Sequence, residues 1–116
     1  GRYIAILPRG SNADPARCWS AGKYVELAKR AVLNGITPVV FGGPEERAVG
    51  AAIAKAEPRA RNLVTRADIF QSAALFERAC LAVGDDVSLM HVAAAAGAPC
   101  VVFLSALHNP TPAAPR

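Results

Sequence analysis

The sequence of 116 residues is poor in aromatic side chains, in cysteine and in net charge, and each scarcity excludes a class of protein. Aromatic residues make up 6% of the chain and hydrophobic residues 53%, so small and aliphatic side chains must fill the core. That composition suits helices packed on a sheet better than an aromatic-rich β-sandwich. The length is that of one domain with a substantial core.

Three cysteines, Cys18, Cys80 and Cys100, form no C-x-x-C pair. Cys80 and Cys100 lie in apolar runs, so we expect both to be buried as small hydrophobic residues. Cysteines that serve as buried small hydrophobic residues favour a reducing compartment. His91 and His108 have no ligand spacing with the cysteines, so we expect no metal site. We also expect no cofactor.

The net charge is only +4, and no basic stripe carries interleaved aromatic residues, which argues against nucleic-acid binding. No apolar run is long enough to span a bilayer, and no signal peptide is recognisable. We therefore expect a cytoplasmic protein.

Strand and helix signals alternate along the chain. Short apolar runs bounded by turn residues predict strands at 2–7, 37–41, 62–64, 80–84 and 100–104. Helical spacing and capping residues predict helices at about 24–34, 44–55, 69–79 and 87–96. Because the strands read as continuous apolar runs, we predict a doubly wound parallel sheet of about five strands with helices on both faces. Residues 1–105 would form this Rossmann-like domain, and 106–116 a Pro-rich tail.

Right-handed crossovers bring every strand-to-helix loop to one edge of such a sheet, where ligands bind. The loops in question are 8–19, 42–44, 65–68 and 85–88. The P-loop pattern G-x-x-x-x-G-K-[ST] and the dinucleotide pattern G-x-G-x-x-G are both absent, so neither of those nucleotide sites is expected. No Ser-His-Asp set is evident, and acids that follow the fourth strand fit a phosphoacceptor domain poorly.

The segment GDDVSLMHVAAAAGAP, residues 84–99, places acids and one histidine at the start of a small-residue helix. Asp86 is suited to cap that helix by accepting bonds from backbone N–H groups two and three residues later. The free N–H groups and the helix dipole there suit an anion, commonly a phosphate, and Ser88 and His91 share one face. Spacing alone leaves two interpretations open: an anion site, or a capped core helix with an exposed Asp85 and a structural His91.

Two further loops carry groups suited to a nucleotide. In GSNADPAR, Ser11 offers a donor and Arg17 a planar clamp for phosphate. In FGGPEER, a carboxylate at Glu45 or Glu46 is placed to accept bonds from ribose hydroxyls, although acids in a first helical turn also favour the helix dipole. Each loop by itself is equally compatible with an ordinary surface turn.

Taken together, these loops resemble the C-terminal half of the bacterial heptosyltransferases of lipopolysaccharide synthesis, which are glycosyltransferases of the GT-B fold. The family pattern is close to G-N-D-[ST]-G-x-M-H-[LV]-A-A-A-x-G-x-P. This chain matches it at Gly84, Asp86, Met90, His91, Val92, Ala93, Ala94, Ala95, Gly97 and Pro99. The resemblance covers nearly the whole chain, and the Gly-Gly-Pro-Glu turn supports it.

The resemblance implies that the chain binds a nucleotide-sugar donor, ADP-heptose-like, in a cleft that faces an acceptor-binding N-terminal half outside this sequence. The implied reaction is transfer, with inversion, to a glycolipid acceptor. The catalytic base would belong to the other half, which would also make any contact with the inner membrane, so we expect this chain alone to transfer nothing. Arg17 and Asp86 would position the leaving group or the sugar. The other implied donor-binding residues are Gly10, Ser11, Glu45, Glu46, Val87, Ser88, Leu89 and His91.

Departures from the family pattern leave two alternatives open. Asp85 stands where Asn is common and adds negative charge near a diphosphate. Val87 replaces a hydroxyl residue, and Ser88 replaces a glycine that allows close backbone approach. These changes would suit a non-catalytic nucleotide- or sugar-binding module of the same fold. The other alternative is a plain flavodoxin-like domain without a nucleotide site.

Overall fold

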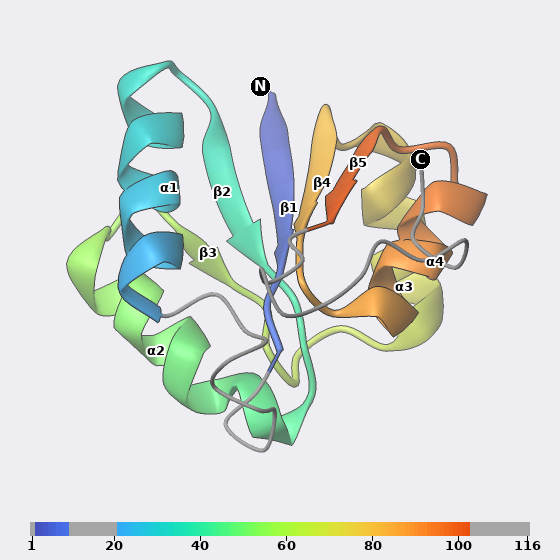
Figure 1. Cartoon of the computed structure of the whole chain (residues 1–116), viewed down its shortest axis with the longest axis horizontal. Coiled ribbons are helices and arrows are strands. Elements are labelled where there is room, and N and C mark those ends of the chain that lie inside the picture. Colours follow the sequence, from blue (N-terminus) through green and yellow to red (C-terminus); the bar gives the residue numbers. More distant parts are fainter. Residues whose placement is uncertain (1, 10–20, 103–116) are drawn as a thin grey trace.

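A parallel sheet of five strands forms the centre of the molecule in the computed structural model, which describes residues 2–9 and 21–102 (Figure 1). The strands are β1 (Tyr3–Leu7), β2 (Thr37–Val40), β3 (Arg61–Asn62), β4 (Leu81–Gly84) and β5 (Cys100–Val102). They lie in the order β3-β2-β1-β4-β5, and every pairing is parallel. The order reverses direction between β1 and β4, so the sheet is doubly wound as predicted.

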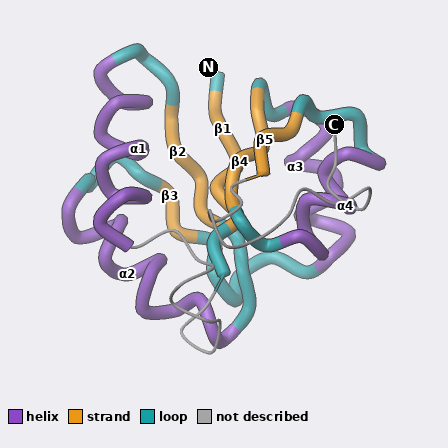
Figure 2. Tube along the Cα trace, viewed as in Figure 1, coloured by secondary structure: helices purple, strands orange, loops and turns teal. Residues whose placement is uncertain are grey.

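In the part of the chain that the structure describes, four α-helices cover the sheet, two on each face (Figures 1 and 2). One face carries α1 (Ala21–Leu33) and α2 (Arg47–Ala56), and the other carries α3 (Ile69–Arg78) and α4 (Val87–Ala95). A short 3-10 turn, η2 (Pro44–Glu46), precedes α2. This arrangement confirms the predicted α/β class. The predicted domain limit at residue 105 and the tail at 106–116 lie outside the described residues.

Local signals located most of the element ends correctly. Asp68 caps α3 by accepting the Gln71 N–H at 2.7 Å, and the Gln71 side chain accepts the Asp68 N–H at 2.9 Å. Pro44 opens the turn after β2, where its fixed backbone angle suits a first helical position. The strand predicted at 62–64 is wrong by its bounds, since β3 ends at Asn62, whose side chain accepts the Val64 N–H at 3.1 Å and turns the chain.

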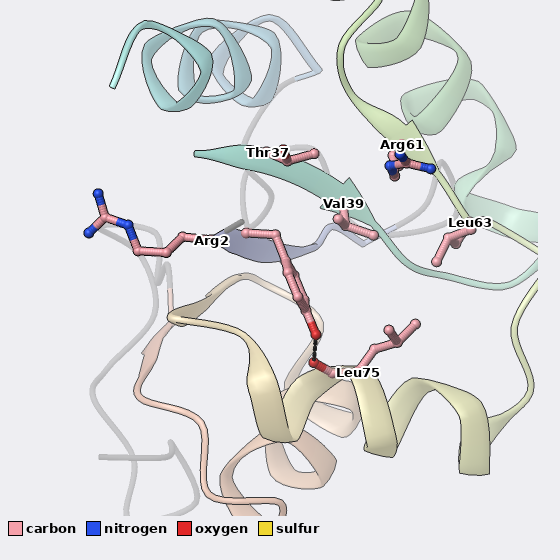
Figure 3. Close-up of a pocket in the computed structure, with 7 residues that line it drawn as sticks. Arg2, Thr37, Val39, Arg61, Leu63 and Leu75 are labelled. Carbon is pink, nitrogen blue, oxygen red and sulfur yellow. Dashed lines mark hydrogen bonds between the residues drawn. The ribbon is translucent and has the colours of Figure 1, made fainter. Parts of the chain in front are cut away.

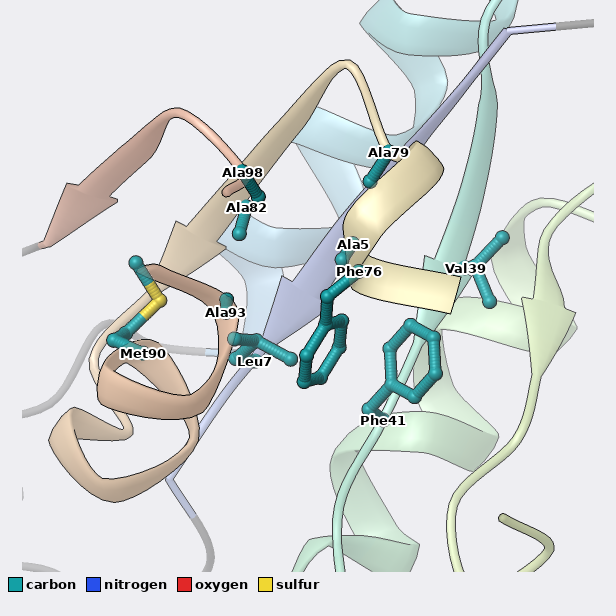
Figure 4. Packing of buried hydrophobic residues seen from close by; sticks show 10 residues of the cluster. All are labelled: Ala5, Leu7, Val39, Phe41, Phe76, Ala79, Ala82, Met90, Ala93 and Ala98. Carbon is teal, nitrogen blue, oxygen red and sulfur yellow. The ribbon is translucent and has the colours of Figure 1, made fainter. Parts of the chain in front are cut away.

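Small side chains and one aromatic pair fill the core on the α3–α4 face (Figure 4). Phe41 and Phe76 pack edge to face with ring centroids 4.8 Å apart. Met90 and Ala93 of α4 are buried, and Ala93 lets this helix lie close to the sheet. The core on the other face consists of aliphatic side chains and one buried tyrosine. Its members are Ile4, Ile6, Tyr24, Ala28, Ala31, Val40, Ile53, Val64 and Val83.

The prediction that Cys80 is buried is wrong. Cys80 is exposed, because it lies after the last turn of α3 and just before β4 begins, at the amino edge of the sheet. Its backbone N–H donates to the Tyr3 carbonyl at 2.9 Å. Cys100 is half-buried, and burial raises the pKa of its thiol. Cys18 lies outside the described residues.

The end of β4 approaches the end of β1 so closely that only glycine fits at position 84. Gly84 pairs with Leu7, and a Cβ added to Gly84 would overlap the Leu7 carbonyl oxygen and lie 2.6 Å from the carbonyl carbon. The next two residues fold back onto the same oxygen, since the N–H groups of Asp85 and Asp86 donate to it at 3.2 and 3.0 Å. The match of Gly84 to the family pattern therefore has a steric cause.

We expect Gly84→Ala to lower the free energy of unfolding by about 2 kcal/mol or more, because the overlap is with backbone that cannot move without breaking the sheet. Gly43→Ala is the matched control, since its Cβ would meet nothing closer than the Glu46 carboxylate at 3.9 Å. Urea unfolding followed by circular dichroism measures both variants. An unchanged midpoint for Gly84→Ala would show that the turn after β4 relaxes freely.

Candidate functional site

The carboxyl edge of the sheet gathers the residues that the sequence singles out. The turn after β2 holds Glu45 and Glu46, and the turn after β4 holds Asp85 and Asp86. These two turns flank the end of β1, next to the point where the strand order reverses, which is where open α/β sheets bind ligands. The segment that follows β1 carries the predicted Gly10, Ser11 and Arg17, all outside the described residues.

The amino end of α4 is built as predicted. Asp86 is its N-cap, with extended backbone, and its carboxylate accepts the Leu89 N–H at 3.2 Å. Burial raises the pKa of Asp86, against the opposing effect of the N–H groups of Leu89 and Ser88 and of the Arg9 charge. Ser88 and His91 are exposed, and Leu89 is half-buried. Exposed polar side chains beside a helix amino end suit an anionic ligand. The Val87 side chain is not among those described.

Asp85 is buried, which corrects the expectation of an exposed Asp85. Its side chain is 3% exposed, and its Oδ1 accepts the Arg9 backbone N–H at 2.8 Å and the Tyr24 hydroxyl at 2.6 Å. The carboxyl group therefore turns into the fold, toward the end of β1 and the start of α1. A buried acceptor with two donors is a satisfied structural group.

The two acids after β2 have different surroundings. Glu46 is 8% exposed and its Oε1 accepts the Gly43 N–H at 2.8 Å, so it closes its own turn. Burial raises the pKa of Glu46, and the negative charges of Asp86 and Glu45 add to the increase, while the Gly43 N–H opposes it. Glu45 is exposed. Of these two predicted ribose acceptors, Glu45 presents its carboxylate to solvent.

A cavity of about 320 Å³ opens at the opposite edge of the sheet, beside α3, and nothing in the sequence pointed to it (Figure 3). Val39, Leu63 and Leu75 turn toward the same space. The Tyr3 hydroxyl donates to the Leu75 carbonyl at 2.6 Å. The complete lining is Arg2, Tyr3, Thr37, Val39, Arg61, Leu63 and Leu75. Because these residues come from separate segments, no local pattern marks the cavity.

Within residues 2–9 and 21–102, no three His, Cys, Asp or Glu side chains gather as a metal site would require. Among the helices in the same part of the chain, none is long and apolar enough to cross a membrane.

The raised pKa of Glu46 makes stability depend on pH in a defined direction. Above the ordinary value of 4.5, the folded protein keeps a proton that the unfolded chain has released. The free energy of unfolding therefore falls as the pH rises from 4.5 through the raised pKa. In Glu46→Gln the amide oxygen still accepts the Gly43 N–H, but the group no longer titrates. We therefore expect the free energy of unfolding of this variant to fall less over this pH window than that of the parent.

Urea unfolding at about pH 4 and about pH 7 measures the decrease in the free energy of unfolding for the parent and for the variant. The free energy of unfolding of Glu46→Gln should still decrease somewhat over this range, because the pKa of Asp86 is raised as well. Glu77→Gln, on the exposed side of α3, is the control for loss of one negative charge and should follow the parent. If the free energy of unfolding decreases as much in Glu46→Gln as in the parent, burial does not raise the pKa of Glu46.

Comparison with known proteins agrees with the motif and with the fold. The family model for glycosyltransferase family 9 (heptosyltransferase) matches residues 1–115. The chain is 35% identical over 113 residues to lipopolysaccharide heptosyltransferase 2 of Escherichia coli, which covers 93% of this chain and 31% of that protein. The chain thus spans about a third of the length of the curated relatives it matches.

Solved structures show the same fold. The structure of the E. coli ADP-heptose lipopolysaccharide heptosyltransferase II superposes with a TM-score of 0.79 at 30% identity, over 89% of this chain and 32% of that one. An E. coli heptosyltransferase solved with ADP gives a TM-score of 0.74 at 22% identity, over 87% of this chain and 33% of that one. With the family model matched over almost the entire chain, the protein belongs to glycosyltransferase family 9, the heptosyltransferase family.

Proposed function

We propose that this chain is the donor-binding part of a glycosyltransferase that moves a sugar of the heptose class from a nucleoside diphosphate to a glycolipid acceptor of the lipopolysaccharide type. The observation that carries the proposal is the capped amino end of α4, which lies at the carboxyl edge of the sheet, where the Asp86 charge reaches Glu46 in the turn that also holds Glu45. The family and a related fold solved with ADP support this assignment.

The diphosphate would lie at the amino end of α4, where the helix dipole favours negative charge. As the bond from the sugar to the diphosphate breaks, negative charge grows on the leaving oxygen. Fixed dipoles and cations stabilise such charge without reorganising. Ser88, Leu89 and His91 would face the diphosphate and the sugar, and Arg17 would supply the cation.

The exposed Glu45 would accept bonds from the ribose hydroxyls, because Glu46 is occupied by its own turn. Asp86 would position the sugar or the leaving group. Its carboxylate already holds the helix cap, so it is fixed in place before the donor arrives.

The chain would bind donor without completing the transfer. In the proposed division, the acceptor site and the base belong to the remaining two-thirds that the relatives' length implies. The reaction would take place in the cytoplasm, with any contact with the inner membrane made by that other part.

The alternative is a non-catalytic nucleotide- or sugar-binding module, which the residues at positions 85, 87 and 88 would suit. The inward direction of the Asp85 carboxyl group weakens this alternative, since that group bonds to Arg9 and Tyr24 rather than pointing out of the turn. One of the three departures from the family pattern therefore has a structural reason.

Titration of the isotope-labelled chain with ADP, observed by NMR, tests the proposed site. We expect shifts in the amides of Ser88, Leu89 and His91, and smaller shifts with UDP if the donor carries adenine. No shifts at millimolar nucleotide would contradict the proposal and favour the domain without a nucleotide site. Shifts only around the cavity at Arg2 would contradict it too, by placing the nucleotide at the opposite edge of the sheet.

A charge added at the start of α4 tests where the phosphates lie. We expect Ser88→Glu to weaken ADP binding about tenfold, because it sets a carboxylate against the diphosphate. The fold should survive, since an acid in a first helical turn favours the helix dipole. Ala94→Glu adds the same charge at an exposed position farther along α4 and should leave the affinity unchanged. Equal effects of both variants would place the diphosphate elsewhere.

A further inference from the structure

Asp85 is an acid whose burial the proposed chemistry does not explain. It lies in the turn between β4 and α4, next to the capping Asp86, yet its side chain is only 3% exposed. Its Oδ1 accepts the Arg9 N–H at 2.8 Å and the Tyr24 hydroxyl at 2.6 Å. Tyr24 is itself fully buried. Polar groups enclosed in this way hold their geometry tightly, because an unmade bond is costly there.

These bonds join three segments at the point where the sheet reverses its order. Arg9 follows β1, Tyr24 lies in the first turn of α1, and Asp85 precedes α4. The backbone N–H groups of Asp85 and Asp86 add two bonds to the Leu7 carbonyl, at 3.2 and 3.0 Å. The start of α4 is therefore tied to β1 by backbone and to α1 by the Asp85 side chain.

We propose that Asp85 is a positioning residue of the donor-phosphate site. It fixes the amino end of α4, and with it Asp86 and the amides of Ser88 and Leu89, against the end of β1 and the start of α1. This inference rests on the proposed function. It assigns to Asp85 the role of an acceptor, so the oxygen matters and the charge does not.

The acceptor role predicts that asparagine can replace Asp85. The Asn side-chain oxygen accepts the same N–H and O–H groups. The negative charge of an aspartate near a diphosphate would only weaken donor binding. Asp85→Asn is therefore the conservative variant that should keep the position of α4.

The test compares two tyrosine variants that each lose one hydroxyl bond of the same length. Tyr24→Phe removes the 2.6 Å bond to Asp85, and Tyr3→Phe removes the 2.6 Å bond to the Leu75 carbonyl at the opposite edge. We expect Tyr24→Phe to weaken ADP binding by about threefold to tenfold and to shift the free-protein amide resonances of Asp86, Ser88 and Leu89. Tyr3→Phe should lower the free energy of unfolding, but it should change neither the affinity for ADP nor the amide resonances of Asp86, Ser88 and Leu89.

Asp85→Asn should bind ADP at least as tightly as the parent, with those amides in place, and Asp85→Ala should bind more weakly. If Asp85→Ala fails to fold, the other three variants still decide the question. Affinities are measured by NMR titration on the folded protein, and stabilities by urea unfolding.

Three outcomes overturn the proposal. Unchanged affinity and unchanged amide positions in Tyr24→Phe would make Asp85 a structural residue only, with the proposed function intact. Loss of ADP binding in Asp85→Asn would show that the charge, not the acceptor, matters. If the parent binds no ADP, the proposed function fails first, and the role of Asp85 in it fails with it.

Discussion

Two acceptors, the carbonyl oxygen of Leu7 and the carboxyl group of Asp85, connect β1, α1 and the turn after β4 at the point where the strand order reverses. The oxygen accepts two backbone N–H groups from the turn after β4. The carboxyl group accepts donors from Arg9 and Tyr24. Because buried polar groups must be paired, this turn has little freedom, and the direction in which α4 leaves the sheet follows from it. The candidate donor site inherits its geometry from these bonds.

Small residues make that arrangement sterically possible. Gly84 admits the Leu7 carbonyl, and Ala82 and Ala93 let α4 lie near β4. Few aromatic residues are needed in this packing: the Phe41–Phe76 pair lies in the same core as the small residues, and Tyr3 packs against it. Of the alanines that follow the histidine, Ala93 is buried in the core, whereas Ala94 and Ala95 are exposed.

The carboxyl edge carries acids that burial disfavours in their charged form. Burial raises the pKa of both Asp86 and Glu46, so both groups reduce stability at neutral pH. Each is kept in place by backbone N–H groups, Asp86 as a helix cap and Glu46 as the closure of its turn. An edge that holds partly desolvated carboxylates beside an open helix end is costly for a purely structural domain, and it is consistent with the site proposed for the donor.

The α/β class, the order of elements, the caps at Asp68 and Asp86, and the family could all be predicted from the amino-acid sequence. All of these depend on local periodicity, on residues three apart or on a contiguous motif, so they can be read along the chain. Four features became visible only in the folded molecule: Asp85 is buried, Cys80 is exposed, Glu46 bonds within its own turn while Glu45 is exposed, and a cavity lies beside Tyr3. The physical reason is distance along the chain: the donors that enclose Asp85 come from 61 and 76 residues away, and no local pattern carries that information.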